Sequence, residues 1–318
     1  MKSLFKILTA LCMLCAFSSA DDFDEAVKAD DAGDYAKAAK LYGKACDKGN
    51  GEACFNLGTM YGFGDGLEQD YAQATKLYKK ACDKDYIDAC YNLALLYEDG
   101  NGVSQDYSQA AKLYKKACDK DDGEACYNLA LLYEDGNGVS QDYSQAAKLY
   151  KQACGGDYLD ACHNLAILYE DGNGVKQDYT QAVKLYEDTC KEDHGLSCYN
   201  LALLYEDGNG VKKDYIKAAK LYKNACSGAY LDACYNLALL YEDGNGVKKD
   251  YIKAAKLYED ACKEDHGVSC NNLGLLYDAG KGVKKDINKA LELYKKACNV
   301  GENLGCTNHR KLKAVSGK

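Results

Sequence analysis

Cysteines recur along this 318-residue chain in pairs of the form Cys-x7-Cys, and successive pairs are separated by a constant interval of 36 residues. The eight pairs are Cys46 and Cys54, Cys82 and Cys90, Cys118 and Cys126, Cys154 and Cys162, Cys190 and Cys198, Cys226 and Cys234, Cys262 and Cys270, and Cys298 and Cys306. Self-similarity at a fixed period of this length is the signature of a solenoid, in which each unit packs against its neighbours.

Each unit is predicted to contain two helices. In the unit 106–141, apolar residues within 107–118 fall at spacings of three and four, which is one face of a helix, and Asp106 is a suitable N-cap. A second run with helical spacing covers 125–133 and stops before Gly136, which can take the left-handed position after a helix. Proline is absent, and no short run alternates between apolar and polar residues, so strands are not expected. The predicted fold is an all-α solenoid of αα-hairpins.

The two cysteines of each pair are expected to form a disulfide. The turn predicted at 121–123 lies midway between Cys118 and Cys126, so both cysteines stand at about the same height in an antiparallel hairpin. Zinc ligands usually lie two to four residues apart and redox pairs have the form Cys-x-x-Cys, and neither pattern occurs among the repeats. We therefore expect consecutive bridges, each worth roughly 2–3 kcal/mol by the chain-entropy estimate, and neither a metal site nor a cofactor. The recurring Glu-Asp-Gly-Asn-Gly-Val loop lacks the ligand spacing of an EF-hand, so calcium is not expected either.

The first 20 residues have the features of a secretory signal peptide. Lys2 and Lys6 precede an apolar stretch over 7–17, and small residues lead up to Ala20, after which we place cleavage. Export to an oxidising compartment agrees with the paired cysteines and predicts a secreted or periplasmic protein. No later segment is long and apolar enough to span a membrane.

The rest of the chain is predicted to be one continuous, monomeric array. Residues 21–33 would form an N-terminal capping helix, 34–285 seven 36-residue repeats, and 286–318 an eighth, partial repeat with a basic C-terminal cap. The formal net charge of −9 becomes −11 without the leader and its two lysines. An acidic surface of this kind disfavours binding to nucleic acids.

A family resemblance is carried by Tyr-Asn-Leu-Ala-Leu-Leu-Tyr-Glu-Asp-Gly-Asn-Gly-Val at 127–139 and by Asp-Tyr-Ser-Gln-Ala-Ala-Lys-Leu-Tyr at 142–150. Over 34–318 the sequence resembles Sel1-like repeats, and the leader with one Cys-x7-Cys per unit resembles the Helicobacter cysteine-rich protein family. The resemblance implies a right-handed superhelix of disulfide-linked hairpins, with a concave face formed by one helix of each pair. It also implies binding of penicillin-type compounds with weak β-lactamase activity, whereas Sel1-like repeats more widely are protein-interaction scaffolds.

No hydrolytic constellation is visible in the repeats. The Ser-x-x-Lys motif of serine β-lactamases occurs only at 3–6, inside the leader. Ser108 and Ser144 are each followed by a lysine four residues later, on a helix face expected to be solvated. Four histidines are present, at His163, His194, His266 and His309. They belong to four different units, and we interpret His194 and His266 as exposed turn residues too far apart to share a metal ion.

One asparagine recurs beside the core leucine of each second helix, although asparagine is a poor residue for a helix interior. These residues are Asn56, Asn92, Asn128, Asn164, Asn200, Asn236 and Asn272. A ladder of amides could hold an extended peptide backbone, or each amide could satisfy a neighbouring helix or loop. The residue before each asparagine varies, as Phe55, Tyr91, Tyr127, His163, Tyr199, Tyr235 and Asn271, which a specificity surface or drift at an exposed site would both produce.

We therefore expect a protein that binds extended peptides or partner proteins on its concave face. The predicted ligand-binding residues are Asn92, Asn128, Asn164, Asn200 and Asn236. The alternative function is the binding or hydrolysis of β-lactams, with cell-wall peptides as related ligands, and a purely structural spacer is the third possibility.

Overall fold

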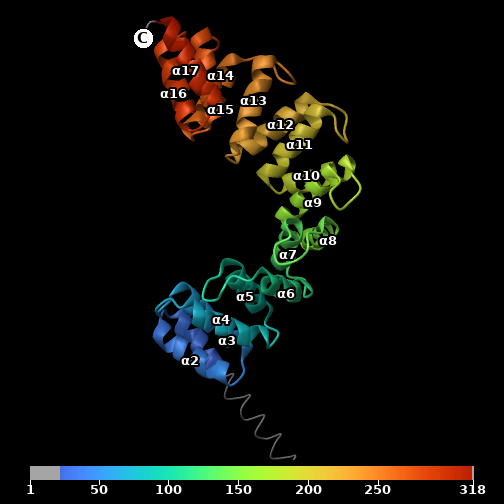
Figure 1. Ribbon diagram of the computed structural model, residues 1–318, viewed down its shortest axis with the longest axis vertical. Helices are drawn as coiled ribbons and strands as arrows, with labels where there is room; N and C mark the ends of the chain where they lie inside the picture. Colours follow the sequence, from blue (N-terminus) through green and yellow to red (C-terminus); the bar gives the residue numbers. More distant parts are fainter. Residues whose placement is uncertain (1–21, 317–318) are drawn as a thin grey trace, which may run out of the picture. The chain divides into compact units, whose positions relative to one another are not determined.

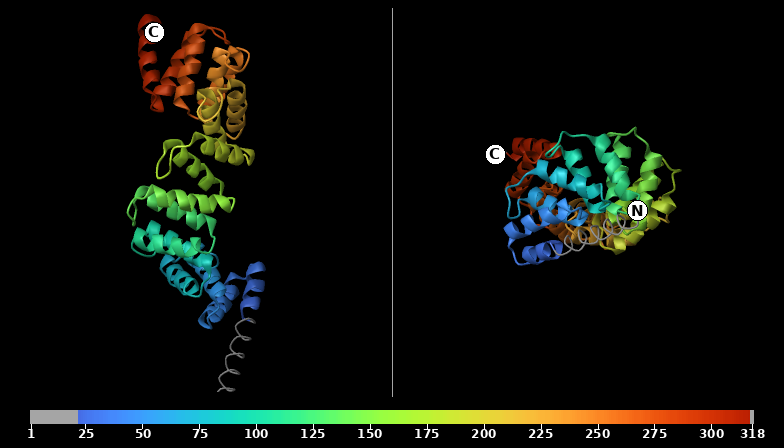
Figure 2. Two further views of the ribbon diagram at one scale, coloured as in Figure 1. Left: turned by 90° about the vertical axis from the view of Figure 1, so that its right-hand side faces the viewer. Right: turned by 90° about the horizontal axis from the view of Figure 1, so that it is seen from below.

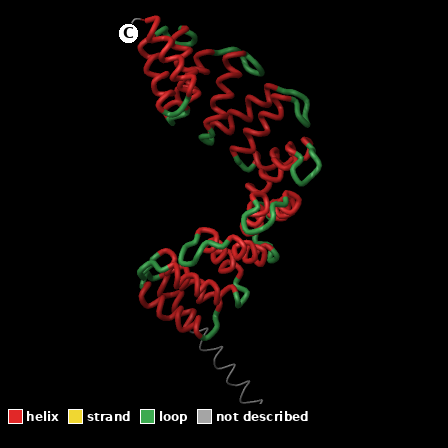
Figure 3. The backbone as a smooth tube through the Cα atoms, viewed as in Figure 1, coloured by secondary structure: helices red, strands yellow, loops and turns green. Residues whose placement is uncertain are grey.

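The computed structural model describes residues 22–316, and all regular secondary structure within this range is helical. Figure 3 shows helices joined by short loops, without a strand in the described part of the chain. The predicted class, an all-α array of helical hairpins, is confirmed. The predicted signal peptide lies outside the described residues.

The chain divides into two compact units, Met1–Ala161 and Cys162–Lys318, named here unit 1 and unit 2 (Figure 1). Unit 1 contains a helix over residues 22–31, α2 (Tyr35–Asp47), α3 (Gly51–Phe63), α4 (Tyr71–Cys82), α5 (Ile87–Asp99), α6 (Tyr107–Cys118), α7 (Gly123–Asp135) and α8 (Tyr143–Gly155). The division falls within α9 (Leu159–Asp171). Unit 2 contains α10 (Tyr179–Lys191), α11 (Gly195–Asp207), α12 (Tyr215–Ser227), α13 (Leu231–Asp243), α14 (Tyr251–Lys263), α15 (Gly267–Ala279), α16 (Ile287–Asn299) and α17 (Asn303–Ser316). Within each unit consecutive helices pack against one another, as the second view in Figure 2 also shows.

The first helix of each repeat begins at a capping aspartate. Asp106 accepts a hydrogen bond from the backbone N–H of Gln109 at 3.0 Å, so the predicted N-cap is confirmed. Equivalent side-chain caps are made by Asp34, Asp70, Asp142, Asp178, Asp214, Asp250 and Asp286. The buried face of α6 consists of Ala110, Ala111, Tyr114, Ala117 and Cys118, which is the predicted apolar face. Small alanines on this face let neighbouring helices approach closely around one large tyrosine.

The turn between the two helices ends one residue earlier than predicted. Asp121 has a φ of 65°, in the left-handed region that aspartate tolerates better than most residues. The side chain of Asp122 then accepts a hydrogen bond from Ala125 N–H at 2.9 Å, so Asp122 is the N-cap and Gly123 is the first residue of α7. A side-chain cap at Asp122 makes the following glycine helical rather than part of the turn.

The loop after each second helix depends on two glycines. Gly136 has a φ of 77° and ends α7 in the left-handed conformation, as predicted. Gly138 lies so close to the first turn of α6 that a Cβ atom there would be 2.3 Å from the carbonyl carbon of Tyr107. Only glycine allows this approach, so the loop rests directly on the helix that precedes α7.

A disulfide joins the two helices of each predicted 36-residue hairpin. Between Cys118 and Cys126 the Cα atoms are 4.6 Å apart, within the range a disulfide requires. The same consecutive pairing is found for Cys46–Cys54, Cys82–Cys90, Cys190–Cys198, Cys226–Cys234, Cys262–Cys270 and Cys298–Cys306. Cys154 and Cys162 are disulfide-bonded as well, so the protein has eight disulfides, one per repeat. This number of bridges fits an oxidising, extracytoplasmic environment.

Among the described residues, none of the helices combines the length and the apolar character that a membrane span requires.

Candidate functional site

The predicted asparagine ladder lies along the second helices, where each asparagine is half-buried. In unit 2, Asn200 Nδ2 donates a hydrogen bond to the hydroxyl oxygen of Tyr186 at 3.2 Å, and Asn272 Nδ2 donates to that of Tyr258 at 3.3 Å. Tyr186 and Tyr258 are fully buried. Each of these amides therefore has a partner inside the protein, which is the structural role that the sequence left open. One such bond uses only part of the hydrogen-bonding capacity of an amide, so a ligand-binding role stays a prediction.

Tyrosine hydroxyl groups of this row also donate hydrogen bonds to carboxylates. Tyr186 donates to Glu170 at 3.2 Å and Tyr222 donates to Glu206 at 2.8 Å, so a carboxylate, a phenol and an amide from three consecutive helices are joined. Burial, followed by the hydrogen bond with Glu206, raises the pKa of Tyr222 well above its ordinary value, so this phenol stays neutral and donates. Burial also raises the pKa of Glu170 above its usual value.

The bond from tyrosine to glutamate also occurs in unit 1, where Tyr114 donates to Glu98 at 2.6 Å and Tyr150 donates to Glu134 at 2.7 Å. The amide of Asn128 donates there to the hydroxyl oxygen of Tyr91 at 3.4 Å. The sequence analysis treated these glutamates only as part of the loop that ends the second helix. A signal was present, because a glutamate, a tyrosine 16 residues later and an asparagine 30 residues later recur in successive repeats. These hydrogen bonds connect consecutive helices through buried polar groups that act as donors and acceptors for one another.

The variable residue before each asparagine packs between two other rings. In unit 2 the ring centroid of Tyr199 is 5.9 Å from that of Tyr222 and 4.9 Å from that of Tyr230. In unit 1 Tyr127 lies 5.8 Å from Tyr150 and 5.1 Å from Tyr158 in the same way. These rings are half-buried, so the second helices present a row of partly exposed aromatic faces beside the amides.

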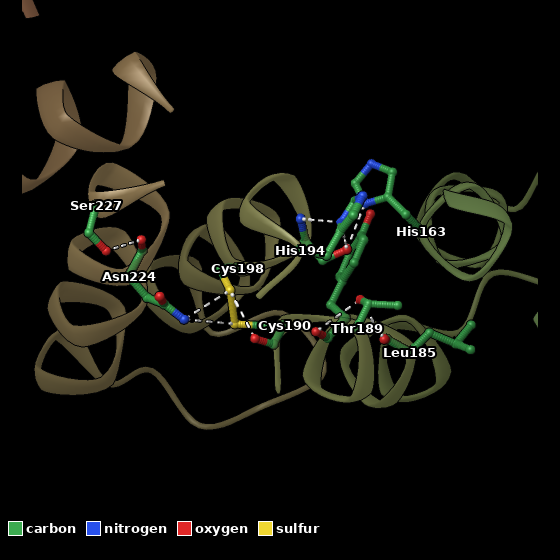
Figure 4. Close-up of a disulfide and its surroundings, with 10 residues drawn as sticks. His163, Leu185, Thr189, Cys190, His194, Cys198, Asn224 and Ser227 are labelled. Atoms are coloured by element: carbon green, nitrogen blue, oxygen red, sulfur yellow. Dashed lines mark hydrogen bonds between the residues drawn. A yellow bond between two sulfur atoms is a disulfide. The ribbon is translucent and has the colours of Figure 1, made fainter. Parts of the chain in front are cut away.

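Two histidines that the sequence analysis placed in separate 36-residue repeats lie next to each other in unit 2. His163 is 4% exposed, and its ring centroid is 5.2 Å from that of His194. The Nδ1 atoms of His163 and His194 lie 2.9 and 2.7 Å from the hydroxyl oxygen of Ser197. Figure 4 shows the two histidines beside each other. The prediction that His194 is an exposed turn residue is wrong, because it caps α11 and is half-buried. Aromatic pairs 31 residues apart in other repeats, such as Tyr127 and Tyr158, were the sequence signal for this contact.

A second cluster contains the residue types of a serine hydrolase. His266 Nδ1 is 2.7 Å from the Ser269 hydroxyl oxygen, and its Nε2 is 3.2 Å from Asp232 Oδ1. Ser269 is completely buried in the first turn of α15, so a substrate carbonyl cannot reach its hydroxyl group. His266 is half-buried at the N-cap position, not exposed as predicted. The cluster fixes a helix start and does not resemble a working catalytic triad.

The two serines considered as nucleophile candidates have local structural contacts. Ser108 donates to the carbonyl oxygen of Gly138 at 3.0 Å and holds the glycine loop against α6. Ser144 donates to Asp142 at 2.6 Å within a helix cap. Across the described residues, no group of three or more histidine, cysteine, aspartate or glutamate side chains is arranged to hold a metal ion. Nothing in the described structure supports a β-lactamase.

The repeated helices and loops match the family model of the Sel1 repeat in eight segments: 27–50, 51–86, 87–122, 123–158, 159–194, 195–230, 231–266 and 267–302. The chain belongs to the Sel1 repeat family. A complete Sel1 repeat here starts with a second helix and ends after the following first helix, as α3 and α4 do within 51–86. Each disulfide except Cys298–Cys306 therefore joins the end of one matched Sel1 repeat to the start of the next, and Cys306 lies beyond the last match.

Solved structures of other Sel1 repeat proteins are similar to this chain. A protective antigen present in uropathogenic Escherichia coli strains and displaying an SLR fold is 28% identical, with a TM-score of 0.80 over 87% of this chain and 60% of the antigen. A Sel1 repeat protein from Oxalobacter formigenes is 31% identical, with a TM-score of 0.64 over 76% of this chain and 99% of its own. The cysteine rich protein B of Helicobacter pylori is 31% identical, with a TM-score of 0.35 over 42% of this chain and 96% of its own. Among curated proteins, no match to the chain is found.

Proposed function

We propose that this Sel1 repeat protein is an exported scaffold that binds extended peptides or segments of partner proteins along its second helices. The observation that supports the proposal is the row of half-buried aromatic rings and amides that recurs once per repeat. In unit 2 this row includes Tyr199 and Asn200 on α11, and Tyr235 and Asn236 on α13. An extended peptide presents backbone N–H and C=O groups at regular intervals along its length. A periodic row of amides and rings therefore suits it better than a compact ligand.

The aromatic ring beside each amide gives the row its chemical selectivity. Tyrosine offers a large contact area with few rotatable bonds, so little conformational entropy is lost when a ligand packs against it. His163 and Asn271, which replace the tyrosine that most repeats have at this position, are only 4% and 2% exposed and do not offer a surface to a ligand. The row is therefore interrupted at these two repeats, and a bound peptide would contact the tyrosine rings of the others.

Export by the predicted leader completes the proposal. Sixteen disulfide-bonded cysteines support folding in an oxidising compartment. The hydrolysis of β-lactams is not part of the proposal, because the candidate serines Ser108 and Ser144 and the two serine–histidine clusters have structural contacts.

The test begins with a random 12-residue peptide library selected on the oxidised protein, followed by anisotropy titrations of an enriched peptide. The variant Asn200→Ala/Asn236→Ala/Asn272→Ala should bind that peptide roughly 10- to 1000-fold more weakly, at about 0.5–1.5 kcal/mol per amide. The control variant Tyr186→Phe/Tyr222→Phe/Tyr258→Phe removes the same internal hydrogen bonds from the buried side. Those three tyrosines are 0% exposed, so they cannot touch a ligand.

The control variant should keep its affinity, measured at a temperature where both variants are folded. Unchanged affinity in the asparagine variant, with loss of stability in both variants, would show that the amides are structural and would remove them from the proposed site.

A further inference from the structure

Unit 2 contains two surface grooves that are equivalent and one repeat apart. The first has a volume of about 470 Å³ and lies between α10 and α12, with Leu201 and Tyr205 of α11 at its floor. The second has a volume of about 290 Å³ and lies between α12 and α14, with Leu237 and Tyr241 of α13 at its floor. Neither groove is lined by the asparagines of the proposed peptide site, so these are separate surfaces.

The floor of each groove is apolar, and its edge carries lysines. In the first groove Lys217 Nζ is 4.7 Å from the ring centroid of Tyr205 and 3.4 Å from its hydroxyl oxygen. In the second, Lys253 Nζ is 5.1 Å from the ring centroid of Tyr241. The ring faces hold these ammonium groups beside the floor instead of leaving them extended into solvent.

Positive charge exceeds negative charge in both grooves. The first is lined by Lys191, Lys217 and Lys220 against Glu187, and the second by Lys223, Lys253 and Lys256 against Asp260.

Both acidic groups have other partners. Glu187 accepts a hydrogen bond from the Tyr205 hydroxyl at 2.9 Å, and Asp260 pairs with Lys263 at 2.9 Å. Two of the lysines are paired as well, Lys191 with Asp188 at 2.9 Å and Lys253 with Asp250 at 3.8 Å. Within the described residues, Lys220 and Lys256 take part in no ion pair. The two halves of the sequence also differ in net charge, because 162–318 has 23 lysines and arginines against 22 acidic residues, whereas 1–161 has 17 against 27.

We propose that these two grooves together bind one extended acidic segment of a partner protein. Carboxylates of the segment would pair with the lysines at the edges, and large apolar side chains would pack on the leucine and tyrosine floors. An apolar floor matches a polypeptide with mixed side chains better than it matches a polyphosphate chain.

Unit 1 supplies a matched set of variants. Its repeats have Gln109 and Gln145 where unit 2 has Lys217 and Lys253. The variant Lys217→Gln/Lys253→Gln therefore introduces a residue that the fold already accepts at that position. The control, Lys112→Gln/Lys148→Gln, removes two charges from exposed first-helix positions in unit 1.

The experiment measures fluorescence anisotropy of three labelled probes with the oxidised full chain. The probes are a peptide of four Glu-Leu-Ser triplets, the same peptide with glutamine for glutamate, and a 12-nucleotide oligothymidylate. We expect the glutamate peptide to bind about ten-fold more tightly than the glutamine peptide, and Lys217→Gln/Lys253→Gln to weaken it about five- to ten-fold. Lys112→Gln/Lys148→Gln should change its affinity less than two-fold.

Three results would overturn the proposal: equal affinity for the two peptides, equal losses in the groove and control variants, or tighter binding of oligothymidylate than of the glutamate peptide. The asparagine variant of unit 2 should retain full affinity for the glutamate peptide. Failure of the grooves can therefore be told apart from failure of the proposed second-helix site.

Discussion

Equivalent loops of the two units stabilise the same tyrosine in different ways. In unit 1, Gln105 Nε2 donates to the carbonyl oxygen of Glu98 at 2.7 Å and to the hydroxyl oxygen of Tyr107 at 3.1 Å. The first such loop of unit 2 keeps this arrangement through Gln177, but in the next loop the equivalent residue is Lys213, whose ammonium group lies 4.7 Å from the ring centroid of Tyr215. A neutral hydrogen bond has been exchanged for a cation–π contact while the loop and the helix cap are unchanged. The repeat therefore tolerates a change of surface chemistry as long as its internal positions are kept.

The buried positions of the two units are nearly identical. Tyr114 in unit 1 and Tyr222 in unit 2 are both 0% exposed, and each donates to a glutamate on the preceding helix. Charge differs only outside this core. The comparison teaches that the array keeps one stabilising pattern throughout and varies its exposed residues, which is the arrangement a scaffold with several binding surfaces needs.

The largest expected effect tests the shared core by alkaline titration. The pKa is raised, first of all by burial, for Tyr42, Tyr78, Tyr114, Tyr186, Tyr222, Tyr258 and Tyr294. A phenol with a folded pKa above the unfolded value of about 10 contributes stability that is present below pH 10 and is lost as pH rises through the folded pKa. Each can contribute a slope of up to about 1.4 kcal/mol per pH unit, so stability should fall by several kcal/mol between pH 10 and 12.

Circular-dichroism melts across this pH range would measure the loss, and hydrogen exchange would assign it to unit 1 or unit 2. Both units should weaken over the same range, since both have the buried tyrosine row. Unfolding of one unit at a clearly lower pH would show that the cores are not equivalent.

Removal of one disulfide should lower the free energy of unfolding by a similar amount in each unit. Cys118→Ser/Cys126→Ser in unit 1 and Cys226→Ser/Cys234→Ser in unit 2 open loops of the same length. Each should lower the free energy of unfolding by about 2–3 kcal/mol, because the closed loop no longer restricts the unfolded chain. Urea titrations would measure the change, and losses that differ by more than about 1 kcal/mol would mean that neighbouring contacts, not loop closure, dominate.

A smaller effect is expected at a turn residue that differs in one repeat of unit 2. Aspartate takes the left-handed turn position at Asp121 in unit 1 and at Asp193 and Asp265 in unit 2, whereas Ala229 takes it with a φ of 65°. Alanine is strained in this conformation and glycine is not, so Ala229→Gly should raise stability by about 0.5–1 kcal/mol. Gly49, with a φ of 94°, shows that glycine is accepted in this position. Thermal melts of Ala229→Gly beside Asp121→Gly would measure the strain, and a decrease for Ala229→Gly would contradict it.

The smallest expected effect exchanges the surface chemistry itself. Lys217→Gln should lose the contact with the Tyr205 ring, and Gln145→Lys should gain the equivalent contact in unit 1. Changes of about 0.5 kcal/mol with opposite signs are expected, since exposed cation–π contacts are weak. Chemical denaturation at low salt would measure both, and two changes of the same sign would contradict the exchange of equivalent contacts.

The features predicted from sequence were those determined within one helical hairpin, such as 106–141. The cap at Asp106, the end of α7 at Gly136 and the bridge between Cys118 and Cys126 follow from local rules for helix ends and turns. The contacts of Glu98 and His163 were missed because they join different helical hairpins. Their partners depend on how one hairpin is stacked on the next. The candidate site was predicted only as a row of asparagines, because sequence periodicity shows that a residue recurs but not which side chains surround it.

The disulfides also determine where a protease can divide the chain. A cut between Cys118 and Cys126 leaves both ends joined through the bridge, so the nicked chain keeps its full length until it is reduced. A cut in the loop 134–139, where Asp135, Asn137 and Gly138 are exposed, falls between two bridges and separates the pieces. The glycine loops are therefore the places where a single cleavage divides the covalent chain, and the hairpin turns are places where cleavage leaves it connected.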